Sequence, residues 1–291
     1  MSTLKPRWKY NPLTATLYNR YLRYRTRHIG AFVFVATTGR SGSATLTRVF
    51  QAADRAVSTH EPYPILTSPF PPRSDDCHYL SKVFWRIKRI NIHRAALGHR
   101  YYIETNHQFI KRFCEAAVCE FYPRIRVVHL VRDPVSVATS FHAIGSIPGK
   151  TESGIRYLLD PHGPDNVLDP RNMFEPLDSP YDDFARCLWY WYETEARIAR
   201  FRTNHPELIW ARIRTDQLNR QPSLHKLFND LTLTYDATAL PNLATSHENV
   251  KTTRKRGSID SNLAIDLDEH VRQHLQALYG DAVRTYSVIE P

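Results

Sequence analysis

Short apolar runs alternate along the chain with longer stretches in which apolar residues recur at helical spacing. The runs 32–36 and 127–131 are rich in β-branched and aromatic side chains, which is typical of strands buried on both faces of a parallel sheet. Residues 101–107 and 207–213 are predicted as further strands. Strands that alternate with helices predict an α/β fold, with a parallel central sheet flanked by helices.

Four stretches between or after the predicted strands have the pattern of helices: 79–100, 183–201, 224–231 and 266–279. The second of these carries a stripe of aromatic residues, which we interpret as packing in the core. Residues 141–178 are rich in Gly, Pro and Asp, and this composition predicts a long loop that lies over the ligand-binding site.

The segment TTGRSGSAT, residues 37–45, lies between the first strand and a helical pattern. A strand, a tight loop and a helix in this order form an anion site, because loop and helix N-terminus expose unpaired N–H groups. The glycines allow the backbone to approach a ligand, the hydroxyls add donors and Arg40 adds a positive charge. The candidate binding residues of this loop are Thr38, Gly39, Arg40, Ser41, Gly42, Ser43, Ala44 and Thr45. The loop is not a Walker A motif, since no lysine occurs between Lys9 and Lys82.

A second motif follows the strand at 127–131. Arg132-Asp133-Pro134 ends this strand, and Pro134 suits the first turn of a helix that has Asp133 near its N-cap. Ser140 falls on this helix. Arg132 and Ser140 are therefore predicted to converge on one phosphate group.

These two motifs resemble those of sulfotransferases. Arg40-Ser41-Gly42-Ser43 is similar to their 5′-phosphosulfate loop, and Arg132 with Ser140 is similar to their 3′-phosphate site. The resemblance covers roughly residues 32–218. It implies a sulfotransferase fold similar to that of P-loop NTPases, and 3′-phosphoadenosine 5′-phosphosulfate (PAPS) as the donor. The sulfuryl group would pass in line to a hydroxyl or amine of a small-molecule or carbohydrate acceptor, whose identity stays open.

Three residues are candidates for the catalytic base. Glu61 and His60 lie in a proline-stiffened segment, where tyrosylprotein sulfotransferases have a proposed glutamate base. Glu104 lies in a segment that resembles the proposed base region of heparan N-sulfotransferases. Thr105 departs from that pattern, because those enzymes often have lysine at this position. The resemblance favours Glu61 first and Glu104 second, with His60 as the alternative.

A basic cluster near the C-terminus consists of Arg254, Lys255, Arg256 and Gly257. It loosely resembles the Arg-Lys-Gly loop with which cytosolic sulfotransferases close over the nucleotide. Arg256 interrupts that pattern, so nucleotide contact and a solvated loop are equally compatible with the sequence.

The chain has 291 residues and a formal net charge of +10, which favours anionic ligands. We divide it into a basic lead-in, residues 1–30, and a single domain, residues 31–291. The lead-in is either an arm that touches a polyanion or membrane, or a helix packed on the domain with its arginines in water. We favour the packed helix. Nucleic acid is not expected as a partner, and the oligomeric state stays open.

Four cysteines, Cys77, Cys114, Cys119 and Cys187, form no CxxC pair and no zinc-ligand pattern. No metal site is expected. Reduced thiols, no apolar run of membrane-spanning length and no signal-peptide core indicate a cytoplasmic protein. Whether an N-terminal anchor was removed from this sequence stays open.

Two other functions are compatible with the loop. One is a small-molecule kinase with a degenerate phosphate loop, although the Walker lysine is missing. The other is a non-catalytic protein that binds polyanions with the same fold. Preference for 3′,5′-bisphosphoadenosine over ATP would argue against the kinase, and turnover of labelled PAPS would argue against the binder.

Overall fold

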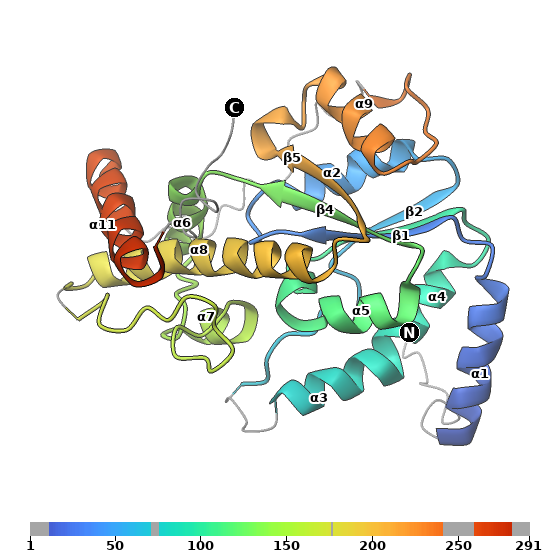
Figure 1. Ribbon diagram of the computed structural model, residues 1–291, viewed down its shortest axis with the longest axis horizontal. Helices are drawn as coiled ribbons and strands as arrows, with labels where there is room; N and C mark the ends of the chain where they lie inside the picture. Colours follow the sequence, from blue (N-terminus) through green and yellow to red (C-terminus); the bar gives the residue numbers. More distant parts are fainter. Residues whose placement is uncertain (1–11, 71–75, 176, 241–258, 281–291) are drawn as a thin grey trace, which may run out of the picture.

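The central element is a five-stranded parallel sheet with the strand order β2-β3-β1-β4-β5 (Figure 1). The structure is a computed structural model that describes residues 12–70, 76–175, 177–240 and 259–280. The strands are β1 (Ala31–Ala36), β2 (Ala56–His60), β3 (Tyr101–Thr105), β4 (Ile125–Val131) and β5 (Ile209–Arg214). The predicted α/β class and parallel sheet are confirmed.

Helices cover both faces of the sheet (Figure 1). The α-helices are α1 (Pro12–Arg25), α2 (Ser43–Val49), α3 (Asp76–Val83), α4 (Arg89–Ala96), α5 (Cys114–Phe121), α6 (Pro134–Ala143), α7 (Glu152–Tyr157), α8 (Tyr181–Asn204), α9 (Gln221–Asp230) and α11 (Ser261–Tyr279). Shorter 3₁₀ or π segments are η2 (Phe50–Ala52), η3 (Phe84–Lys88), η4 (Phe109–Phe113) and η5 (Thr215–Gln217).

The central strand β1 is completely buried, and its side chains alternate between two cores. Val33 and Val35 belong to a cluster that includes residues of α2 and α9. Phe32 and Phe34 belong to a cluster on the other face, with residues of α4, α5 and η4. Because both faces are covered, every residue of the strand can be apolar, which explains the continuous run in the sequence.

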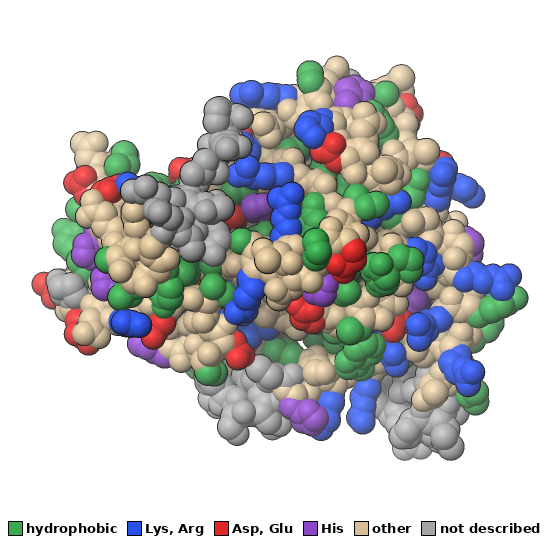
Figure 2. All heavy atoms as spheres, in the orientation of Figure 1, with side chains coloured by type: hydrophobic (Ala, Val, Ile, Leu, Met, Phe, Trp, Pro, Cys, Tyr) green, Lys and Arg blue, Asp and Glu red, His purple; other side chains and the backbone are tan. Residues whose placement is uncertain are grey.

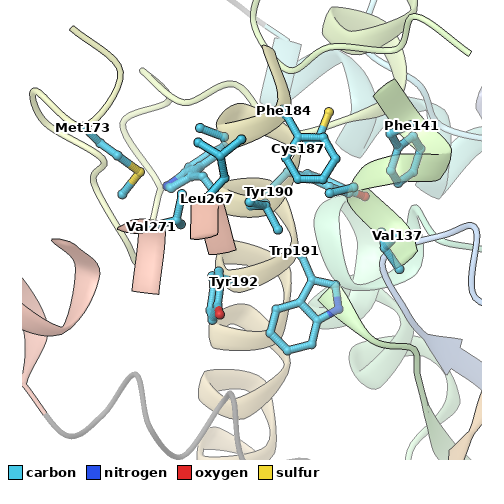
Figure 3. Close-up of a cluster of buried hydrophobic side chains, with 14 of the residues drawn as sticks. Val137, Phe141, Met173, Phe184, Cys187, Tyr190, Trp191, Tyr192, Leu267 and Val271 are labelled. Atoms are coloured by element: carbon cyan, nitrogen blue, oxygen red, sulfur yellow. The ribbon is translucent and has the colours of Figure 1, made fainter. Parts of the chain in front are cut away.

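A third cluster is built around α8. Its four consecutive aromatic residues, 189–192, are each at most 1% exposed. Helix α8 contacts α6 and α11, and Figure 3 shows side chains from these helices directed into a common interior. The aromatic stripe is therefore core packing, as predicted.

Two predicted elements differ from the structure. The predicted loop 141–178 contains the short helix α7, whose N-cap Thr151 accepts a hydrogen bond from the Gly154 N–H. A Cβ on Gly154 would lie 1.8 Å from the carbonyl oxygen of Ile147, so this glycine permits close packing rather than a flexible turn. The predicted helix 79–100 is divided by the π segment η3, which brings Lys88 into the interior.

The helix of the lead-in packs against the domain. Helix α1 contacts α4, and Leu22 is fully buried. Thr26 Oγ1 lies 2.8 Å from His93 Nδ1 in this interface. None of the helices in the described ranges combines the length and apolar character of a membrane-spanning segment.

Candidate functional site

The loop after β1 has a strained backbone. Gly39, Arg40 and Gly42 all have positive φ angles, of 85°, 56° and 83°. For a non-glycine residue such as Arg40 this conformation costs about 1–2 kcal/mol. Left-handed residues in a tight turn direct successive N–H groups toward one concavity, which is an arrangement that binds anions. At Gly42 the space is also limited, because a Cβ would lie 3.0 Å from a methyl group of Leu218.

The hydroxyl groups of the loop have two different roles. Thr38 and Ser41 are buried, and their side-chain oxygens lie 2.9 Å apart. Ser41 also donates to the Gly39 carbonyl at 3.0 Å, so these two hydroxyls hold the loop together. Ser43 and Thr45 are partly exposed at the start of α2. Their hydroxyls are therefore the ones placed to meet a ligand.

The structure brings the two sequence motifs together at Arg40. Arg132 Nη1 donates to the carbonyl oxygen of Arg40 at 2.7 Å, and Arg40 Nε donates to Ser140 Oγ at 2.8 Å. Asp133 caps α6 by accepting a hydrogen bond from the Ser136 N–H at 2.8 Å. This cap begins the helix directly after β4, and so places Ser140 beside the loop.

This convergence creates a local excess of positive charge. Burial and the neighbouring charge of Arg132 both lower the pKa of Arg40. Within the described ranges, no carboxylate forms an ion pair with Arg40 or Arg132. Figure 2 also shows basic side chains near the ends of β4 and β1. Two partly buried guanidinium groups that have no carboxylate partner among the described residues fit an anionic ligand, because partly buried charges are normally paired.

Helix α8 supports both motifs with polar atoms of its aromatic residues. Tyr190 donates its hydroxyl hydrogen to the Thr38 carbonyl at 2.5 Å, and Trp191 Nε1 donates to the Arg132 carbonyl at 2.8 Å. From the sequence we predicted core packing for these residues, and left open that one aromatic of the stripe stacks on adenine. Their aromatic character gave no signal for this second role, because the hydrogen-bond partners are more than 50 residues away in the chain.

Glu104 lies in a buried ion pair. Its side chain is 0% exposed, and Oε1 lies 2.6 Å from Nζ of Lys88, which is also buried. Asn106 donates to Oε1 at 2.9 Å and Tyr102 donates to Oε2 at 2.6 Å. Lys88 also donates to the Pro62 carbonyl at 2.8 Å. Both carboxylate oxygens are thus enclosed and bonded, and this geometry does not support a role for Glu104 as base.

Glu61 forms a pair with His107, whose Nδ1 lies 2.5 Å from Glu61 Oε1. Burial raises the pKa of Glu61, but the hydrogen bond and the positive charge around it outweigh burial and lower the pKa to about 2. Burial, together with the charge of Lys111, lowers the pKa of His107 to about 4. Gln108 Nε2 donates to His107 Nε2 at 2.9 Å, so a neutral imidazole with its proton on Nδ1 satisfies both bonds. Glu61 is ionised and weakly basic in this arrangement.

His60 is the last residue of β2 and is exposed. Its Nδ1 lies 2.9 Å from Thr105 Oγ1, at the end of the neighbouring strand β3. His60 is thus near Glu61 and His107 at the carboxyl edge of the sheet, where ligands bind in open α/β folds.

A separate cavity of about 910 Å³ lies between α3, η4, the segment after α7, and α8. Ser68, Leu80 and Phe84 line it. Lys111 is also in its wall and donates to the Tyr190 hydroxyl at 2.9 Å. No residue of the loop 38–45 is part of this lining.

The remaining predicted donor-binding residues, Arg254, Lys255, Arg256 and Gly257, lie outside the described residues. In the part of the chain that the structure describes, no group of three or more His, Cys, Asp or Glu side chains has the arrangement of a metal site.

Among solved structures, two sulfotransferase domains are similar to this chain. One is from the curacin biosynthetic pathway, with a TM-score of 0.43 and 14% identity, and the match covers 86% of this chain and 97% of that one. The other is from the Synechococcus PCC 7002 olefin synthase, with a TM-score of 0.46 and 14% identity, covering 86% and 95%. No family model and no curated protein matches the sequence. At this level of similarity, the function has to be argued from the site itself.

Proposed function

We propose that the protein is a sulfotransferase that uses PAPS as its sulfuryl donor. The observation that carries this proposal is the meeting of Arg40 and Arg132 at a glycine-containing loop without a carboxylate partner in the described ranges. A group with several anionic oxygens would neutralise both guanidinium groups. The hydrogen bonds among described residues use only Nε of Arg40 and Nη1 of Arg132, so further N–H donors are left for such a ligand.

The loop N–H groups, Ser43 and Thr45 would hold the 5′-phosphosulfate of the donor. Arg132 and Ser140 would bind its 3′-phosphate, as the resemblance of the second motif implies. A hydroxyl or amine of the acceptor attacks the sulfur, and the bond between sulfur and the 5′-phosphate oxygen breaks. Arg40 would stabilise the negative charge that develops on this departing oxygen. Catalysis then consists of positioning and charge stabilisation, together with removal of the acceptor's proton.

The acceptor is proposed to be a small molecule or a carbohydrate. It would approach the carboxyl edge of β2 and β3, where His60, Glu61 and His107 lie close together. These residues offer hydrogen-bonding groups and one carboxylate charge, which suit a polar hydroxyl or amine.

The proposal is tested by binding and by turnover. Calorimetry should show tighter binding of 3′,5′-bisphosphoadenosine than of ATP, and mass spectrometry should detect a sulfo group transferred from PAPS to members of an acceptor panel. Arg40→Ala should lower kcat about 10²–10³-fold without loss of fold, because it removes a charge that stabilises the leaving group. Arg20→Ala is the matched control, since Arg20 is exposed on α1.

The alternatives give different results. Preferential binding of ATP together with phosphoryl transfer would replace the proposal with a kinase function. Binding of bisphosphoadenosine with no transfer to any acceptor would favour the non-catalytic binder. A near-normal kcat for Arg40→Ala would remove Arg40 from the proposed chemistry.

A further inference from the structure

A chain of hydrogen bonds links the loop helix to His60. Thr47 of α2 lies with its Oγ1 2.8 Å from the carbonyl oxygen of Ser43 and 2.5 Å from Thr105 Oγ1. Thr105 Oγ1 in turn lies 2.9 Å from His60 Nδ1. The chain thus passes from α2 through the end of β3 to the end of β2.

The direction of the protons in this chain follows from its first member. The Ser43 carbonyl can only accept, so Thr47 must donate its single hydroxyl hydrogen there. The Thr47 oxygen then accepts the hydroxyl hydrogen of Thr105. Thr105 has no second hydrogen to donate to His60. His60 Nδ1 must therefore donate to the Thr105 oxygen. The opposite order would leave two oxygen lone pairs facing each other 2.8 Å apart at Ser43.

Burial makes this order robust. Thr105 is 0% exposed and Thr47 is 8% exposed, so water does not compete for either hydroxyl. The backbone fixes His60 relative to Thr105, because these two residues are paired in the parallel ladder. Ser58 also donates to the Thr47 carbonyl at 2.7 Å, which joins β2 to α2.

We propose that Thr47 and Thr105 are positioning residues that hold His60 in the tautomer with its proton on Nδ1. This leaves a lone pair on Nε2, and we assign Nε2 of His60 as the atom that accepts the acceptor's proton. The inference rests on the proposed sulfuryl transfer for its role, but the tautomer itself is a property of the protein alone.

The other ionisable residues at this edge of the sheet are less suited to accept a proton. Both nitrogens of His107 are hydrogen-bonded, and both carboxylate oxygens of Glu104 are enclosed. Glu61 keeps one carboxylate oxygen outside its bond to His107, but its pKa of about 2 makes it a weak base. His60 Nε2, in contrast, forms no hydrogen bond with the described residues.

In the proposed step, the acceptor oxygen or nitrogen forms its bond to sulfur while its proton passes to His60 Nε2. The sulfur–oxygen bond to the donor breaks, and 3′,5′-bisphosphoadenosine leaves with the electron pair. His60 becomes an imidazolium that still donates from Nδ1 to Thr105. The hydroxyl chain does not move a proton, and so it positions the imidazole throughout the reaction.

The experiment is ¹⁵N NMR of the histidine side chains in the full-length protein, with His60 assigned through His60→Gln. The wild type should show the Nδ1–H tautomer. Thr47→Val frees the Thr105 hydroxyl to donate to Nδ1 of His60. His60 should then change to the Nε2–H tautomer, although its contact with Thr105 is retained. Thr105→Ser should keep the wild-type signature, and Thr105→Val should lose it.

Kinetics provide the second readout. Thr47→Val and Thr105→Val should lower kcat at least about tenfold, with affinity for 3′,5′-bisphosphoadenosine unchanged, and Thr105→Ser should restore it. Thr194→Val is the matched control, because Thr194 is another buried helical threonine that donates to a carbonyl four residues earlier. It should change neither the tautomer nor kcat.

Two results would overturn the proposal. One is a wild-type His60 with its proton on Nε2, and the other is a Thr47→Val variant that still shows the Nδ1–H form. Both are read without any acceptor, so they stand apart from the fate of the sulfotransferase assignment. Melting temperatures and amide spectra of each variant establish that it is folded.

Discussion

Glu104→Gln separates a structural role of this residue from a catalytic one. In the protein Glu104 and Lys88 are 2.6 Å apart and both are inaccessible to solvent. Glutamine keeps the shape and can still bond Asn106 and Tyr102, but it removes the charge that faces Lys88. Breaking a buried pair in this way typically costs about 3–5 kcal/mol.

The loss of folding stability caused by Glu104→Gln is limited, because Lys88 can give up its proton. Burial lowers the pKa of Lys88, and the nearby Glu104 carboxylate opposes this shift. Without that carboxylate, Lys88 can become neutral in the folded state. Relative to an unfolded lysine of pKa about 10.4, this costs about 1.4 kcal/mol per pH unit, or about 4.6 kcal/mol at pH 7. For a chain of this size, a loss of about 3–5 kcal/mol lowers Tm by about 5–8 °C.

The pH dependence of the variant's stability follows from the proton of Lys88. In the variant, unfolded Lys88 binds a proton that folded Lys88 does not, so stability rises with pH. The deficit of the variant should therefore shrink by up to about 1.4 kcal/mol per unit between pH 7 and 9. Denaturant unfolding at both pH values measures this.

Two variants serve as controls for this prediction. Glu152→Gln removes an exposed ion pair with Arg156 and should cost less than about 1 kcal/mol. Replacing both partners, with Lys88→Met added to Glu104→Gln, should recover part of the stability. A cost below about 1 kcal/mol for Glu104→Gln, combined with a 10²–10⁴-fold loss of kcat, would refute the reasoning and identify Glu104 as the base.

Two further predictions concern the site. Arg132→Ala and Ser140→Ala should each weaken binding of 3′,5′-bisphosphoadenosine by about 1.5–3 kcal/mol while leaving adenosine 5′-monophosphate almost unaffected. Calorimetry that shows an unchanged 3′-phosphate preference in both variants would exclude this pair from the nucleotide site. Glu61→Gln should lower kcat less than tenfold at neutral pH, because a carboxylate with a pKa of about 2 is a weak base. A loss of 10²-fold or more in steady-state assays with saturating donor would return that role to Glu61.

Much of the fold could be predicted from the sequence because local physical rules determine it. The apolar run of β1 requires cover on both faces, and parallel strands with intervening helices are the arrangement that supplies it. The glycines and hydroxyls after β1, and the Arg-Asp-Pro end of β4, likewise predicted two neighbouring strand ends as the site that we propose. Asp133 capped its helix as its residue type predicted.

The different roles of the ionisable residues are determined only by the tertiary structure. Family resemblance ranked Glu61 before Glu104 and His60, but local pattern does not separate them, since each lies at or next to the end of a strand at the same edge. Glu104 differs from the others because a π segment turns Lys88 inward to meet it. Such a contact depends on the depth and rotation of two separate elements, which residue type and spacing do not specify.

The two threonines illustrate the same limit. Nothing in the pattern around Thr47 or Thr105 distinguishes them from threonines that merely pack, because each is 13 or more residues from His60 in the chain. Strand register and the position of α2 bring their hydroxyls within hydrogen-bonding distance. The sequence by itself determined the class of fold and indicated where the proposed anion site lies. The direction of the protons within that site was determined by the three-dimensional packing, because a hydrogen bond depends on distances of a few tenths of an ångström.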